Sequence, residues 1–161
     1  TTRTGEKITV QLQPNWMVRA TIQVKLEDIK TGDFVGASAI KGADGELVAE
    51  AIHYLGQDQA TRDRAQGDIP WDLTPQSLMV NADVGTIVKA PNGALSVKMV
   101  HKNATYDLAI SPTPPVVRYE PGDKALLVKG AWLFFTAQKQ PNGTYTATTI
   151  TAETKGVKPP L

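Results

Sequence analysis

Cysteine is absent from this chain of 161 residues, which excludes disulfides, thiolate nucleophiles and cysteine-ligated metal sites. Aromatic residues make up only 6%, and no apolar run approaches the roughly 18 residues that a membrane helix requires. Neither sign of charge dominates, because the sequence has 17 basic and 16 acidic side chains. Binding of phosphate groups needs concentrated basic charge. The composition therefore predicts a soluble globular protein without a membrane span, for which nucleic acid is not an expected partner.

Recognised catalytic patterns are also absent from the sequence. There is no GxSxG nucleophile elbow and no glycine-rich phosphate loop. Paired carboxylates near Glu27, Asp28 and Asp33 are typical of a solvated turn. We therefore predict that the protein is not an enzyme, and we assign no catalytic residues and no cofactor.

A metal site has only weak candidates. His53 precedes Asp58 and Asp63, and these three side chains would be the ligands of a loose divalent site. Their spacing matches no recognised ligand motif. The alternative interpretation is that His53 is an outward-facing histidine on a strand.

An internal repeat is the most informative feature that the chain does have. Shifting the sequence by 98 positions (130 − 32 = 98) brings its two halves into register without a gap. The aligned identities include turn-forming glycines and prolines as well as core-sized apolar residues, as expected of a duplicated fold. They include Pro14 with Pro112, Val18 with Val116, Gly32 with Gly130, Gly45 with Gly143, Ala49 with Ala147 and Ile52 with Ile150.

Short β-rich runs separated by turn residues recur in both halves. In the second half they are Val84–Ala90, Ala94–Val100, Thr105–Ile110, Ala131–Gln138 and Thr144–Ala152, with a hairpin turn at Pro91-Asn92-Gly93. The apolar alternation slips by one residue before Ile52 and before Ile150. A bulge near Glu50-Ala51 and another near Thr148-Thr149 would explain both slips.

These patterns predict an all-β protein of two tandem, small OB-like barrels with five strands each. The expected divisions are a first module at 1–55, a crossover linker at 56–79, a second module at 80–154 and an extended tail at 155–161. Thr1 aligns with Met99, so the counterparts of Val80–Lys98 would precede Thr1. We expect a removed or missing segment there, and a first barrel without its first strand in this chain.

Aromatic side chains supply the candidate partner-binding residues. In the run Trp132-Leu133-Phe134-Phe135, strand alternation places Trp132 and Phe134 on the face opposite Leu133. Phe34 occupies the repeat position of Trp132. These rings either pack between the modules or form an exposed patch that binds a partner, and Phe34, Trp132 and Phe134 are the candidates for the second role.

Several stretches resemble a group of exported bacterial proteins of unknown function with tandem OB-like β modules, some automatically named as metal-transporter components. The matching stretches are Leu26–Gly36, Asp44–His53, Pro70–Pro75, Pro121–Leu127, Lys139–Gly143 and Gly156–Leu161. The resemblance implies a periplasmic or secreted protein from which a signal peptide is removed. A permease role does not fit a chain without a membrane span.

We therefore expect a non-enzymatic exported protein that acts as a protein-binding accessory or assembly subunit, with a protein partner or homo-oligomer. The alternative is a periplasmic carrier of a small ligand or metal.

Overall fold

A computed structural model describes residues 1–42, 45–57, 59–91, 95–102, 104–110 and 114–160 of an all-β protein. The chain forms two compact units. Unit 1 contains Thr1–Ile22 and Tyr119–Pro159, and unit 2 contains Gln23–Arg118 with Pro160–Leu161. The chain therefore passes from one unit to the other at Ile22–Gln23 and returns at Arg118–Tyr119.

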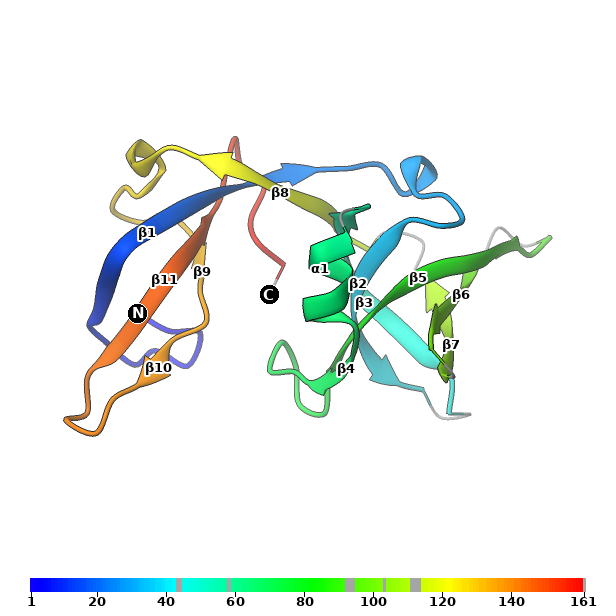
Figure 1. Cartoon of the computed structure of the whole chain (residues 1–161), viewed down its shortest axis with the longest axis horizontal. Coiled ribbons are helices and arrows are strands. Elements are labelled where there is room, and N and C mark those ends of the chain that lie inside the picture. The colour runs from blue at the N-terminus through cyan, green and yellow to red at the C-terminus, as the bar shows by residue number, and fades with distance from the viewer. Residues whose placement is uncertain (43–44, 58, 92–94, 103, 111–113, 161) are drawn as a thin grey trace. The chain divides into compact units, whose positions relative to one another are not determined.

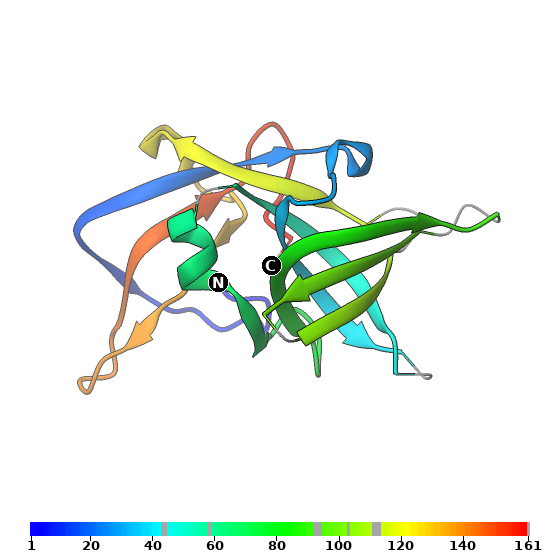
Figure 2. The same ribbon diagram turned by 45° about the vertical axis from the view of Figure 1, so that its right-hand side comes forward.

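Unit 2 contains a closed five-stranded barrel (Figure 1; Figure 2). Its strands are β2 (Phe34–Lys41), β3 (Leu47–Gly56), β5 (Leu78–Lys89), β6 (Leu95–His101) and β7 (Ala104–Ile110). Antiparallel pairs join β3 to β2, β2 to β5, β5 to β6 and β6 to β7. A parallel pair between β7 and β3 closes the barrel.

The β5–β6 hairpin matches the sequence prediction, although Asn92 and Gly93 of its turn lie outside the described residues. Its first strand changes register between Val84 and Thr86. Gly85 lies at this irregularity, where an added Cβ would be 3.2 Å from the carbonyl oxygen of Lys98. The absence of a side chain at Gly85 thus lets β5 bend closely over β6.

The segment between β3 and β5 contains the helix α1 (Gln59–Ala65) and the short strand β4 (Gly67–Pro70), which pairs with the first half of β5. The sequence predicts an exposed loop or a turn of helix here, and the helix is confirmed. The crossover is anchored to the barrel, because the Thr74 hydroxyl donates a 2.8 Å hydrogen bond to Glu50.

The bulge predicted before Ile52 is confirmed. Ser38 pairs with Ala51 and Ala39 pairs with Ala49, so Glu50 is the extra residue of β3. One extra residue reverses the alternation of side chains along a strand. Ala49 and Ile52 can therefore both face the barrel core, where they are buried.

Unit 1 is built around β1 (Val10–Gln23) and β11 (Tyr145–Ala152), which pair in parallel. The short strands β9 (Leu133–Phe134) and β10 (Gln138–Lys139) both pair antiparallel with β11. The sequence predicts one continuous strand over Ala131–Gln138. In the structure this strand is interrupted, and β11 is its one described neighbour, which gives a short strand little support.

The strand β8 (Val116–Gly122) begins in unit 2 and ends in unit 1. In unit 2, Val116–Arg118 pairs in parallel with Ile52–Tyr54 of β3. In unit 1, Gly122 lies against the backbone of Arg19 and Ala20 of β1. Between β1 and β2 lies the short 3₁₀ helix η1 (Leu26–Asp28), and η2 (Lys124–Leu126) follows β8.

Strand registers in the two units correspond at the same 98-residue offset. The pair Val18–Ile150 of unit 1 corresponds to the pair Val116–Ile52 of unit 2. Leu12 pairs with Ala147 in unit 1, just as Ile110 pairs with Ala49 in unit 2. The register of the β1–β11 pair goes from Ala147 to Thr149 without including Thr148, which is the repeat counterpart of Glu50.

The strands are nevertheless not divided as two consecutive barrels at 1–55 and 80–154. The barrel takes β2 and β3 from the first predicted module and β5, β6 and β7 from the second. The first module's β1 pairs instead with β11 of the second module. Such an exchange is physically accessible, because equivalent strands present the same apolar face in the same register to either neighbour.

We expect a fragment of residues 23–118 to fold cooperatively, because it contains all five barrel strands. A fragment of residues 80–154 lacks β2 and β3 and should remain unfolded. Amide chemical-shift dispersion and urea unfolding of both fragments measure the difference. A folded 80–154 fragment beside an unfolded 23–118 fragment would contradict the exchanged arrangement.

Candidate functional site

His53 lies on β3 of unit 2, away from the protein surface. On β3 it is flanked by Gly36 of β2 and Val117 of β8, and its side chain is buried. Its Nε2 lies 3.4 Å from the Ser38 hydroxyl. Burial lowers the pKa of His53 to about 4, so the ring is neutral at pH 7. The ring does point away from the barrel core, on the face opposite Ile52, but this face is covered and the ring is not exposed to solvent.

Of the two predicted acidic partners of His53, the structure describes only Asp63. Asp63 lies on α1 and accepts a 2.8 Å hydrogen bond from the Gln59 side chain. Asp58 lies outside the described residues. Within the described ranges, no group of three or more His, Cys, Asp or Glu side chains could hold a metal ion. No helix in those ranges is long and apolar enough to cross a membrane.

Phe34 is completely buried, so it is not available to a partner at the surface. The Arg62 guanidinium from α1 lies over its ring, 5.7 Å from the centroid. Arg62 is held there by an ion pair with Asp83 at 2.9 Å and by a hydrogen bond to the carbonyl oxygen of Gly32 at 2.8 Å. Assignment of Phe34 to a partner-binding patch is therefore wrong.

Trp132 and Phe134 lie in unit 1 beside a sheet edge. Trp132 is 51% exposed, and the Lys158 ammonium lies 4.3 Å from the centroid of its ring. Phe134 is half-buried on β9, where it pairs with Thr151. Leu133 is 39% exposed, although alternation predicts that it faces a core.

The repeat shows why Leu133 is exposed. Its counterpart in unit 2 is Val35, which is only 3% exposed, and the counterpart of Trp132 is Phe34. In unit 2, β2 lies between β3 and β5. In unit 1, the segment 132–137 has β11 on one side, and the described part of the unit contains no counterpart of β5 on the other.

A second edge of unit 1 is open in the same way. Val10–Leu12 of β1 pairs with β11, as Leu108–Ile110 of β7 pairs with β3. In unit 2 the other side of β7 is covered by β6. Among the described strands of unit 1, β8 lies on the other side of β1, but it ends beside Arg19 and Ala20 and does not reach Val10–Leu12. Val10 and Leu12 are only half-buried, whereas Leu108 and Ile110 are buried. We call Val10–Leu12 and 132–137 the open edges.

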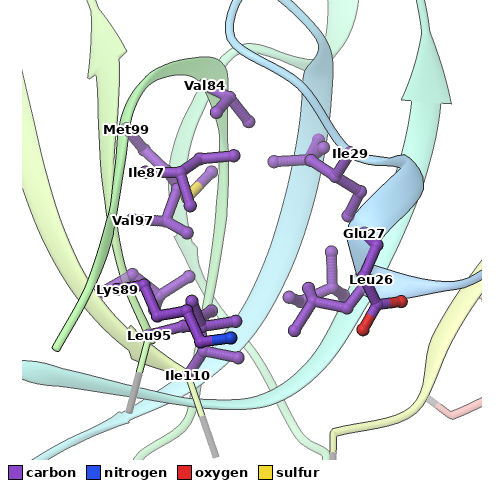
Figure 3. A pocket seen from close by; sticks show the side chains of 13 residues that line it. Leu26, Glu27, Ile29, Val84, Ile87, Lys89, Leu95, Val97, Met99 and Ile110 are labelled. Carbon is purple, nitrogen blue, oxygen red and sulfur yellow. The ribbon is translucent and has the colours of Figure 1, made fainter. Parts of the chain in front are cut away.

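Unit 2 contains an apolar cavity of about 240 Å³ inside its barrel (Figure 3). Figure 3 shows side chains of β5 and β6, among them Ile87, Val97 and Met99, facing Leu26 and Ile29 across the cavity. Sequence reasoning missed this cavity. No single stretch of sequence signals it, because its lining comes from η1 and from all five barrel strands.

Comparison of the chain with protein-family models, curated proteins and solved structures found no match. The resemblance to exported proteins therefore stays a prediction from the sequence.

The buried His53 predicts a pH dependence of stability. Its pKa is about 4 in the folded protein and near 6.5 when unfolded, so the unfolded chain binds a proton that the folded one does not. Stability is retained above the unfolded pKa and falls as the pH drops from about 6.5 to about 4. The loss should reach about 3 kcal/mol.

Urea unfolding of the wild type and His53→Gln at several pH values measures this contribution, because other titrating groups are common to both proteins. His53→Gln should show the shallower dependence. Parallel pH profiles would mean that His53 is not buried as a neutral ring.

Proposed function

We propose that the protein is a non-enzymatic protein-binding accessory subunit, and that unit 1 binds an antiparallel β-hairpin of a partner protein. The observation that supports this most directly is the exposure of Leu133, at the position where unit 2 buries Val35 inside its barrel. The same fold position is covered in one unit and uncovered in the other.

The hairpin would lie where β5 and β6 lie in unit 2. There, β5 pairs with β2 from Phe34 to Ala39, and β6 pairs with the whole of β7. By the repeat, the partner's first strand would pair with 132–137 and its second with Val10–Leu12. The completed unit would then be a second five-stranded, OB-like barrel.

Two physical effects favour the binding of a hairpin at the open edges. Edge strands present unpaired backbone N–H and C=O groups, which an added strand satisfies by regular hydrogen bonds. The inward side chains of the hairpin would cover Leu133 and the half-buried Val10 and Leu12, and so remove apolar surface from water. We therefore expect the partner hairpin to be apolar on its inward face.

We propose an exported location on the basis of the sequence resemblance alone. In that setting the protein would act outside the cytoplasm as an assembly subunit.

The hairpin of unit 2 provides a defined probe. A synthetic peptide of residues 78–101 should bind the intact protein saturably at about one peptide per chain. Binding should slow amide hydrogen exchange at those residues of Val10–Leu12 and 132–137 whose N–H points away from β11, because these groups become hydrogen-bonded to the hairpin. Calorimetry measures the stoichiometry, and exchange mass spectrometry or NMR locates the site.

Leu133→Lys should weaken peptide binding by about tenfold or more, because a charge would be buried against the hairpin. Val128→Lys is the matched control, since Val128 is an exposed apolar residue of unit 1 outside its strands. It should bind as the wild type does. Equal binding by all three proteins, or dimerisation of the chain with no peptide binding, would overturn the proposal.

A further inference from the structure

We propose that the barrel of unit 2 binds a small apolar molecule of about ten non-hydrogen atoms with an uncharged polar group at one end. The proposal concerns unit 2 alone and does not depend on hairpin binding by unit 1.

The cavity is large enough to hold a small molecule. Protein interiors contain few voids larger than a water molecule. An apolar cavity of roughly 150 Å³ stays dry and binds benzene. A cavity of about 240 Å³ can therefore hold about ten non-hydrogen atoms in the same way.

The buried walls of the cavity are apolar and come from several barrel strands. They include Val35 of β2, Val84 of β5, Met99 of β6 and Leu108 of β7. The lining, within the described residues, includes no aromatic ring. The flexible thioether of Met99 adapts to an irregular space. These walls therefore enclose a space that a small apolar molecule can occupy.

The chemistry of the lining sets the ligand class. Val84, Val97 and Leu108 are buried side chains of the cavity wall, and none of them offers a hydrogen bond. A polar group in their midst would lose its hydration without compensation. The body of the ligand must therefore be apolar.

The mouth of the cavity accommodates the polar end. Lys89 and Glu27 are exposed lining residues, and their charged groups lie toward the same end of the cavity in Figure 3. One basic and one acidic group give no preference for either charge, while both can form hydrogen bonds. An uncharged hydroxyl is therefore the favoured polar group.

The 3₁₀ helix η1 covers one side of this mouth and provides a route of entry. Leu26 and Ile29 face the cavity, and Leu26 is only half-buried. The N-cap residue of η1, Lys25, makes no side-chain capping hydrogen bond. Opening of this single turn would expose the cavity while the barrel strands stay paired.

The test uses 1-decanol with the intact protein. Saturable binding should raise the thermal midpoint by several degrees, because the ligand binds only the folded state. It should also shift the methyl resonance of Met99, which lines the cavity. Decanoate and decylamine should each bind more weakly than decanol, since the mouth presents both charges.

Cavity-filling variants separate ligand binding from general surface association. Val97→Phe should abolish the decanol shift, because the ring would occupy the cavity. Ile87→Phe provides a second test at the mouth, where Ile87 is 38% exposed and a larger side chain can be accommodated. Val88→Phe is the matched control, since Val88 is next to Ile87 in the chain, is 55% exposed and does not line the cavity.

Loss of binding in Ile87→Phe with retention in Val88→Phe would support the site even if Val97→Phe fails to fold. Absence of saturable decanol binding up to its solubility limit would overturn the proposal. So would equal decanol binding by Ile87→Phe and Val88→Phe, or tighter binding of decanoate or decylamine than of decanol.

Discussion

The parallel pairing of β3 with β7 is the constraint on which the rest of the structure depends. It closes the barrel of unit 2 by joining Leu47–Ala49 to Leu108–Ile110, two stretches that lie far apart in the sequence. Once β7 occupies this position beside β3, the equivalent strand β1 pairs with β11 in unit 1. The two units then differ in what surrounds the same strand positions. One becomes a closed barrel with a buried core, and the other keeps two open edges.

The sequence predicts local structure well because its signals act over short distances. The hairpin of β5 and β6, the bulge at Glu50 and the helical turn near α1 all arise from residues close to them in the chain. Pairing between repeats is different. Gln11 and Ala109 are equivalent positions, so the alternation pattern alone fits either one as the partner of Val48. For this reason the sequence predicted two consecutive barrels where the structure exchanges strands.

Only part of the candidate site could be predicted from the sequence. The run around Trp132 has apolar side chains on both faces of the strand, which indicates an unusual surface, and Trp132 does lie beside an open edge. The neighbours of Phe34 are Arg62 and Asp83, from elements that sequence spacing could not bring to it, so its burial was not predictable. His53 lies beside Ser38 on the face of the sheet opposite the barrel core, and this face is covered in the folded chain, which its alternation pattern does not reveal. The cavity follows from the packing of five strands together, which no single stretch of sequence specifies.

Disulfide mapping tests the exchanged pairing most directly, because the chain has no native cysteine. Val48 and Ala109 are adjacent across the β3–β7 ladder, whereas consecutive barrels would place Val48 beside Gln11. Oxidation of the double variants Val48→Cys/Ala109→Cys and Gln11→Cys/Val48→Cys, read by peptide mass mapping, distinguishes the two. We expect an intramolecular disulfide to form rapidly in the first variant and not in the second. The opposite result would contradict this account of the fold.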